Sequence, residues 1–194
     1  MEAGLRQAVI VVALLNLGYF GVEFAVALAI GSVSLFADSV DFLEDASVNL
    51  LIALALAWSP VWRARAGMAM AAFLLVPGLA TLWTAWDKLM APLPPDPAAL
   101  SLAALGALAV NLSCAFLLAR WRRHGGSLSR AAFLSARNDA AANLAIIASA
   151  LVTAWLWPSG WPDLIVGLAI AALNADAARE VWQAAREEHR AAQP

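Results

Sequence analysis

Acidic side chains lie within apolar stretches of this sequence, where a charge is costly unless it has a partner or a function. Asp41 and Asp45 form an Asp-x-x-x-Asp motif, with Asp38 before it and Asn49 after it. At ~100° per residue, these four positions fall within about 80° of one another on a helix. The spacing therefore predicts one polar, mainly acidic helix face.

Two other stretches carry polar faces of the same kind. Ser135, Asp139 and Asn143 follow one another at intervals of four residues, which places them in a stripe along one side of a helix. Asn16 and Glu23 are seven residues apart and also share a face. We expect the three stripes to face a common interior.

Carboxylates gathered in such an interior repel one another and take up protons, because burial and like charge both disfavour the ionised form. A divalent cation relieves the same conflict by replacing the protons, so that metal binding is linked to proton release. Asp41, Asp45 and Asp139 are therefore candidate metal ligands. A polar packing cluster is the alternative, and the shortage of cationic partners argues against it.

The composition indicates which elements position these side chains. Of the 194 residues, 63% are hydrophobic and 13% are charged, whereas soluble domains have about 45–50% apolar and about 25% charged residues. The apolar stretches are long enough to cross ~30 Å of hydrocarbon as helices. Cys114 is the only cysteine, which excludes a disulfide framework and a thiolate cluster. The first apolar stretch leads directly into the second, so no cleaved signal peptide is expected.

The apolar stretches predict an all-α membrane protein with six transmembrane helices. Turns rich in glycine and proline separate them. The first 185 residues form one transport domain, and residues 186–194 form a short cytoplasmic tail with no soluble carboxy-terminal domain after it. The six predicted helices cover residues 8–30, 33–58, 67–90, 97–121, 128–155 and 162–185.

The distribution of basic residues predicts the orientation. Of the twelve Lys and Arg residues, only Lys88 falls in an odd-numbered connection. The positive-inside rule then places both termini in the cytoplasm, and we expect a bacterial inner membrane. The tryptophans cluster near segment ends, as in an aromatic belt. The basic residues on the predicted cytoplasmic side are Arg6, Arg63, Arg65, Arg120, Arg122, Arg123, Arg130, Arg179, Arg186 and Arg190.

The depth of the charged residues in the predicted helices separates their roles. Asp45 and Asp139 lie near the midplane, where secondary transporters hold their substrate, and Asp38 lies nearer the outer surface as a candidate outer-path site. Arg137 is the one strongly basic side chain well inside the bilayer. We expect it to pair with Glu44 or with Glu23.

The stretch that contains the acidic motif resembles the second transmembrane helix of the cation diffusion facilitator family. It reads Gly-Ser-Val-Ser-Leu-Phe-Ala-Asp-Ser-Val-Asp-Phe-Leu-Glu-Asp over residues 31–45. The family carries Asp/His-x-x-x-Asp in this helix, which Asp41 and Asp45 match. It carries His/Asp-x-x-x-Asp in its fifth helix, where Asp139 matches and Ser135 stands in place of the first residue.

Two further stretches are similar to the same family, and the resemblance covers essentially the whole chain. They are the helix that carries Asn16 and Glu23, and Trp-Pro-Asp-Leu-Ile-Val-Gly at residues 161–167. The resemblance implies a homodimeric exporter of zinc or similar divalent ions, which exchanges them for protons by alternating access. The family's usual cytoplasmic carboxy-terminal domain has no counterpart in this sequence.

The fourth ligand depends on how the second and fifth helices align, and the sequence leaves two registers open. The two helices run antiparallel. If Asp45 and Asp139 are level, Asn143 comes level with Asp41 and its carbonyl oxygen is the fourth ligand. If Asp41 and Asp139 are level, Ser135 comes level with Asp45.

The ligand chemistry bears on the transported ion. Family resemblance favours zinc or cadmium, whereas an all-oxygen site also suits manganese or iron(II). No prosthetic group and no nucleic acid are expected as partners, only metal ions, lipid and a second copy of the chain. For a dimer through transmembrane helices, Gly67 and Gly78 make the third helix a candidate interface.

A membrane enzyme is the main rival interpretation. Phospholipid alcohol phosphotransferases also carry Asp-x-x-x-Asp on a helix and hold a catalytic metal with it. They need an upstream Asp-Gly and a basic residue for the phosphates, and neither stands near Asp38. We therefore expect a secondary transporter and not an enzyme.

Overall fold

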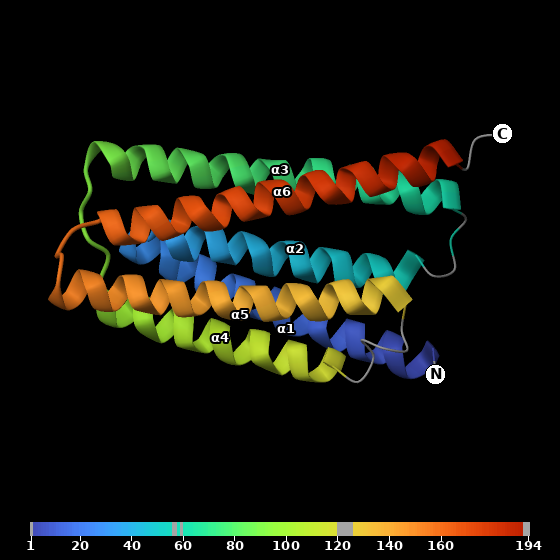
Figure 1. Cartoon of the computed structure of the whole chain (residues 1–194), viewed down its shortest axis with the longest axis horizontal. Coiled ribbons are helices and arrows are strands. Elements are labelled where there is room, and N and C mark those ends of the chain that lie inside the picture. Colours follow the sequence, from blue (N-terminus) through green and yellow to red (C-terminus); the bar gives the residue numbers. More distant parts are fainter. Residues whose placement is uncertain (1, 56–57, 59, 120–125, 192–194) are drawn as a thin grey trace.

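Six helices make up the computed structural model, which describes residues 2–55, 58, 60–119 and 126–191. The prediction of an all-helical protein is confirmed for these residues. Figure 1 shows the helices lying side by side as a bundle. They are α1 (Glu2–Ile30), α2 (Val33–Ala55), α3 (Pro60–Met90), α4 (Pro97–Ala119), α5 (Gly126–Trp155) and α6 (Trp161–Ala191).

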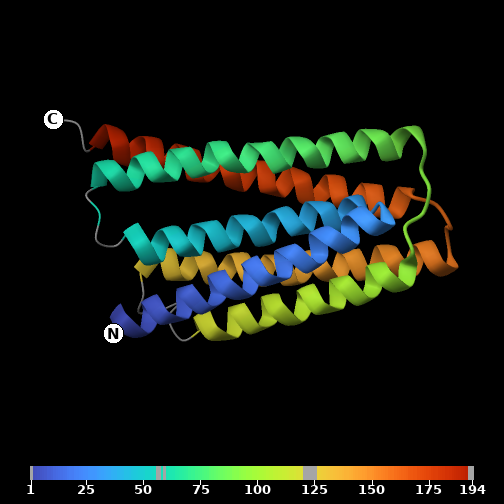
Figure 2. The same cartoon turned by 180° about the vertical axis from the view of Figure 1, so that it is seen from behind.

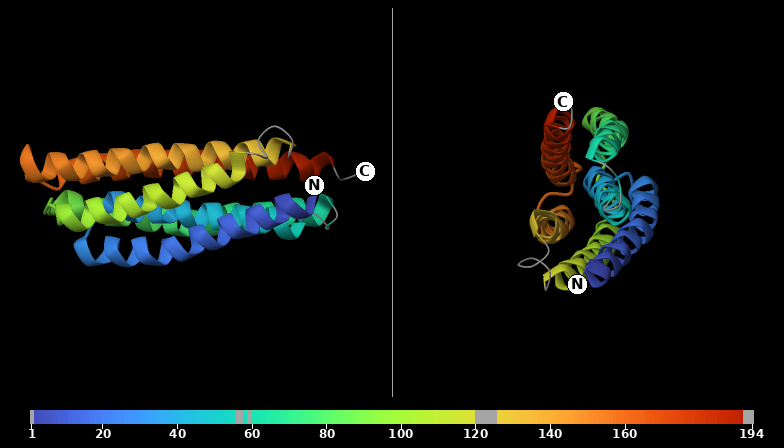
Figure 3. Two further views of the ribbon diagram at one scale, coloured as in Figure 1. Left: turned by 90° about the horizontal axis from the view of Figure 1, so that it is seen from below. Right: turned by 90° about the vertical axis from the view of Figure 1, so that its right-hand side faces the viewer.

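The two ends of the bundle differ in what they contain. Helix α1 begins and α6 ends at the same end, here called the terminal end (Figures 1 and 2). The opposite end, here called the distal end, holds the turn at Gly31 and Ser32 and the connections at residues 91–96 and 156–160. Helix α2 lies inside the bundle, between the pair α3 and α6 on one side and α1, α4 and α5 on the other (Figure 3).

Two of the described helices are long and apolar enough to cross a membrane by themselves, namely Gly4–Ile30 and Pro97–Ala119. The other helices carry charged residues along their length, which lowers their mean hydropathy. Apolarity alone therefore identifies fewer spans than the bundle has helices.

Most helix ends match the predicted segments, and the differences have one cause. Helices α1, α3 and α5 end at Ile30, Met90 and Trp155 as predicted. Helix α3 begins at Pro60, before the predicted residue 67, and α6 continues to Ala191. Residues 186–191 are therefore helical, and their place as a short cytoplasmic tail stays a prediction. An apolar stretch marks only the part of a helix that suits lipid, whereas backbone hydrogen bonds continue into polar sequence.

Some predictions concern parts of the chain outside the described residues. Arg120, Arg122 and Arg123 of the basic set lie there, as does residue 121 at the predicted end of the fourth helix. The surroundings of Gly67 and Gly78, the candidate dimer contacts, are outside the described part as well.

Local sequence explains the turns at the distal end. Gly31 adopts a positive φ of 64°, the left-handed conformation that glycine reaches without steric cost. It lets α1 turn directly into α2. Helix α4 begins with Pro97 after Asp96, whose carboxylate accepts a hydrogen bond of 2.7 Å from the Ala99 N–H. An aspartate cap followed by proline is a common helix start.

Small apolar side chains fill the core where the inner helices meet. Ala37, Ala104 and Ala150 are completely buried, together with Leu35 and Ile146. Small residues let helix backbones approach closely, which is how helices pack in a membrane. The polar stripes are held against this packed core.

Candidate metal-binding site

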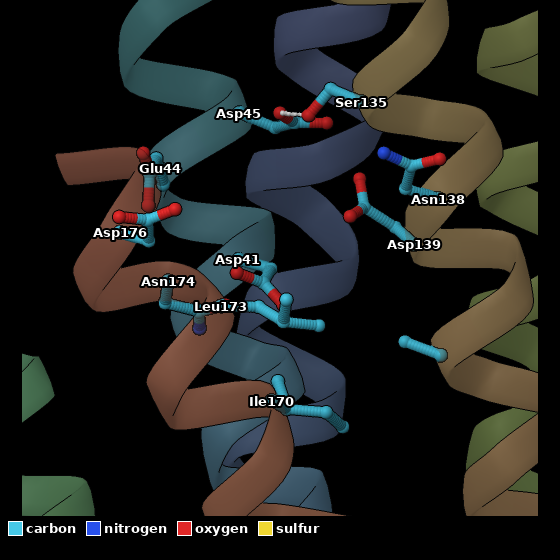
Figure 4. A pocket seen from close by; sticks show the side chains of 11 residues that line it. Asp41, Glu44, Asp45, Ser135, Asn138, Asp139, Ile170, Leu173, Asn174 and Asp176 are labelled. Carbon is cyan, nitrogen blue, oxygen red and sulfur yellow. Dashed lines mark hydrogen bonds between the residues drawn. The ribbon is translucent and has the colours of Figure 1, made fainter. Parts of the chain in front are cut away.

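A cavity of about 240 Å³ lies between α2, α5 and α6, near the middle of each helix. It contains all three of the predicted metal ligands. Figure 4 shows Asp41 and Asp45 on α2 facing Asp139, which points from α5 toward α2. The lining residues are Asp41, Glu44, Asp45, Ser135, Asn138, Asp139, Ala142, Ile170, Leu173, Asn174 and Asp176.

Two contacts fix the alignment of α2 against α5. The Ser135 hydroxyl donates a hydrogen bond of 3.0 Å to Asp45 Oδ1. The Asn143 amide nitrogen donates to both oxygens of Asp38, at 3.1 and 2.9 Å. Asp139, midway between Ser135 and Asn143, therefore comes level with Asp41. Of the two registers left open by the sequence, the structure has the one in which Ser135 is level with Asp45.

This register gives Ser135 and Asn143 different surroundings. Ser135 lines the cavity beside Asp45. Asn143 is not among the lining residues: its amide nitrogen contacts Asp38 and also donates to the Asp139 backbone carbonyl at 2.9 Å. Asp38 itself is completely buried and lies on the distal side of the cavity.

Asp45 is held in place by two asparagines. Asn16 on α1 donates to Asp45 Oδ2 at 3.5 Å, and Asn49 donates to the Asp45 backbone carbonyl at 2.8 Å. The first contact ties the polar stripe of α1 to that of α2, as the spacing predicted. The Asp41 carboxylate lies within electrostatic range of Asp139, Asp38, Glu44 and Asp45.

Asp45 and Asp139 lie within hydrogen-bonding range of each other, and Asp41 lies within electrostatic range of both. Within the described part of the chain, no three His, Cys, Asp or Glu side chains lie close enough to hold one metal ion together. Carboxylates this close to one another in a buried site repel one another when they are ionised.

The expected ion pair of Arg137 is absent. Its side chain is exposed and donates a hydrogen bond of 3.2 Å to Asn138 Oδ1, so it pairs with neither Glu44 nor Glu23. Arg137 lies two positions from Asp139 on α5, roughly on the opposite side of the helix. The cavity therefore has a strongly acidic lining with no arginine to offset it among the described residues.

Several lining residues had not been singled out from the sequence. Asp176 lies within the predicted sixth segment, and its charge there was the signal that could have identified it. Asn138 adjoins Asp139, and Asn174 donates a hydrogen bond of 3.2 Å to the Ala37 carbonyl of α2. Asn138, Leu173 and Asp176 are exposed and form the mouth of the cavity between α5 and α6.

The distal end of the bundle is closed by one carboxylate. Asp163 at the start of α6 accepts hydrogen bonds from the Ser32 hydroxyl at 2.7 Å and from the Val33 N–H at 2.8 Å. It also accepts from the Ser34 N–H at 3.2 Å and from the Ser34 hydroxyl. The Asp163 carboxylate thus caps the positive end of α2 from another helix.

Contacts around Asp163 strengthen this closure. Lys88 Nζ donates to the Gly31 carbonyl at 2.6 Å, which ties α3 to the same turn. Gly167 lies so close to α2 that a β-carbon there would be 2.7 Å from the Val33 carbonyl carbon. The cavity is thus open near the middle of the bundle and sealed at the distal end.

The comparison with protein families gives one finding. The family model described as the cation efflux transmembrane domain matches residues 9–187. No curated protein matches the chain significantly.

Proposed function

This chain belongs to the cation diffusion facilitator family of cation efflux transporters, and from that premise we propose that it exports divalent transition-metal cations in exchange for protons. The observation that carries the proposal is the cavity in which Asp41, Asp45 and Asp139 face one another across two helices. The family is one of transporters, which argues against the phosphotransferase interpretation.

The metal site consists of Asp41, Asp45 and Asp139, with Ser135 as the fourth ligand. The hydrogen bond from Ser135 to Asp45 supports this choice over Asn143. Carboxylates bind metal in the deprotonated form, so each ion that enters releases the protons held there. One site then serves both ions, which is the basis of the exchange.

Metal binding also provides the free energy for a conformational change. A ligand shifts an equilibrium only by its differential affinity for the two states. Within the described residues no three acidic, histidine or cysteine side chains already surround one point, and an ion that gathers Asp41, Asp45 and Asp139 favours a state in which α2 and α5 pack more closely around it. Release of the ion on the other side, with protons taking its place, favours the return.

The open cavity and the closed distal end support an inward-facing state. We propose six transmembrane spans within residues 1–185, with both termini in the cytoplasm of a bacterial inner membrane. The cavity mouth at Asn138 and Asp176 then admits cytoplasmic metal, and the contacts of Asp163 form the outer closure. The homodimer forms through transmembrane helices.

The ligands and the family together predict which metals the protein transports most readily. All donors at the site are oxygen atoms, and Cys114 is buried elsewhere, 3.8 Å from Asn16 Oδ1. Zinc and cadmium come first because of the family. Manganese and iron(II) are accepted because they tolerate oxygen ligands well.

Transport in proteoliposomes tests the proposal. With an imposed pH gradient, wild-type protein should move zinc, cadmium, manganese or iron(II), and the ion should be accompanied by proton counterflow. Asp45→Ala and Asp139→Ala should each reduce flux to background, because each substitution removes one of the carboxylate ligands that hold the ion.

Asp87→Asn is the matched control, because Asp87 is an exposed carboxylate far along α3 from the cavity. It should transport like wild type. Unchanged flux in both Asp45→Ala and Asp139→Ala would refute the site, and the absence of flux for all four metals would refute the function.

A further inference from the structure

A second polar cluster lies beyond the cavity toward the distal end, centred on Glu23 of α1. The Glu23 side chain is 0% exposed, and neither of its carboxyl oxygens has a hydrogen-bond partner. A buried charged group without a partner costs several kcal/mol. Such a group is neutralised by a proton or by a cation that binds it.

Glu23 faces a second carboxylate that is equally buried. Asp38 is 0% exposed, and the two carboxyl groups lie within hydrogen-bonding range of each other. Both are acceptors when ionised, so the pair needs either a shared proton or a bound cation, and a divalent cation can replace that proton. Two cationic side chains of the described helices are engaged elsewhere: Arg137 donates to Asn138 at the surface, and Lys88 donates to the Gly31 carbonyl.

Asn143 completes the cluster from α5. It is 0% exposed, its amide nitrogen donates to both oxygens of Asp38, and its Oδ1 has no partner. Rotation by half a turn about the last side-chain bond exchanges the nitrogen and oxygen of an amide. Asn143 therefore offers Asp38 a hydrogen bond when no metal is bound and can offer a carbonyl oxygen to a cation.

We propose that Glu23, Asp38 and Asn143 form a second divalent-cation site, one helical turn beyond the cavity on the way to the distal end. The inference rests on the proposed transport function, since it adds a step to the path of the same ion. Two carboxylates balance the charge of one divalent ion, and the amide oxygen adds a neutral ligand. Within the described residues no third His, Cys, Asp or Glu joins this cluster.

The register of α2 and α5 places the two sites in sequence. Asp45 and Ser135 are at one level, Asp41 and Asp139 at the next, and Asp38 and Asn143 at the third. Each step is about one helical turn, or ~5.4 Å. An ion leaving Asp41 and Asp139 toward the distal end meets Asp38 and Glu23 next, before the closure made by Asp163.

Cadmium binding to the purified full-length protein in detergent tests the proposal. Equilibrium dialysis should show about two ions per chain for wild type and about one for the double variant Asp45→Ala/Asp139→Ala, since each oxygen cluster holds one ion. Adding Glu23→Gln to the double variant should remove the remaining ion. Asp87→Asn should bind cadmium like wild type and controls for loss of a surface carboxylate.

Two variants guard against a folding artefact. Glu23→Gln keeps the shape of the side chain, and Asn143→Ala removes the amide oxygen but leaves both carboxylates in place. Each should lower cadmium binding of the double variant while the protein still elutes as a monodisperse peak. If wild type binds one ion and Glu23→Gln leaves that ion in place, the second site is refuted. Failure of the proposed function gives a different result: if Asp41, Asp45 and Asp139 do not bind metal, the variant Asp45→Ala/Asp139→Ala binds as many cadmium ions as wild type.

Discussion

Asp163 and Glu23 are both completely buried carboxylates, but they differ in the hydrogen bonds that the surrounding helices donate to them. Asp163 accepts four hydrogen bonds from the turn before α2 and from the start of that helix. Glu23 accepts none. The reason is position: the first N–H groups of a helix have no backbone partner and are free to bind an anion, whereas Glu23 faces α2 at Asp38, beyond its first turn, where the backbone N–H groups are used within the helix.

The contrast separates a structural acid from a binding one. A carboxylate with a full set of donors gains nothing from a cation and holds two helices together. A buried carboxylate without hydrogen-bond donors is stabilised when a proton or a cation binds it. Substitutions at the two positions should therefore change stability in opposite directions.

Asp163→Ala is expected to give the largest loss of stability. It removes four hydrogen bonds to a charged group and leaves the buried N–H groups of Val33 and Ser34 without acceptors, which costs about 3 kcal/mol or more. Thermal unfolding in detergent, followed by size-exclusion chromatography with fluorescence detection, measures the effect. Asp96→Ala, which removes a carboxylate cap from exposed residues at the same end, should cost only about 1 kcal/mol. An Asp163→Ala protein as stable as wild type would contradict the structural role.

Gly167→Ala should have a smaller effect at the same closure. The added β-carbon would lie 2.7 Å from the Val33 carbonyl carbon and 2.8 Å from the Ser34 nitrogen, and backbone atoms cannot move aside as a flexible side chain can. Overpacking of this kind costs about 1–3 kcal/mol. Gly21→Ala is the matched control, because a β-carbon added at Gly21 would have nothing within 4 Å and alanine favours a helix. Equal unfolding temperatures for the two variants would show that α6 and α2 separate easily.

Glu23→Gln should change the free energy of unfolding least of the three variants, and it should increase it. Without metal, glutamine removes the repulsion with Asp38 and supplies an N–H that Asp38 can accept, a gain of about 1 kcal/mol. The unfolding temperature of metal-free Glu23→Gln protein, compared with that of wild type, measures it. A marked decrease would mean that the Glu23 carboxylate is satisfied in the protein, and the contrast with Asp163 would fail.

Much of this arrangement could be predicted from residue types and spacing. The intervals between Asp41 and Asp45 and between Ser135 and Asp139 fix which side chains share a helix face, because helical geometry is the same in every fold. The same argument placed Asn16 on the face that contacts Asp45, and the hydrogen bond between them is present. The family match over residues 9–187 agrees with the resemblance seen in these motifs.

The errors and gaps arose where one helix meets another. Arg137 was expected to pair with a buried acid, yet its side chain reaches the surface, because a long side chain can turn away from the position of its own Cα. The lining contributed by Asp176 and Asn174 depends on how α6 packs on α2, for which no spacing along the chain gives a measure. Periodicity describes one helix at a time.

The sequence by itself determined the helices, their polar stripes and the candidate ligands Asp41, Asp45 and Asp139, since each follows from local periodicity and residue chemistry. Only the tertiary structure decided the register of α2 against α5, which sets Ser135 beside Asp45 and Asn143 beside Asp38. It alone showed that Asp163 is satisfied while Glu23 is not. Those outcomes depend on sliding and rotating whole helices past one another, and the energy that selects among such arrangements comes from contacts between residues far apart in the chain.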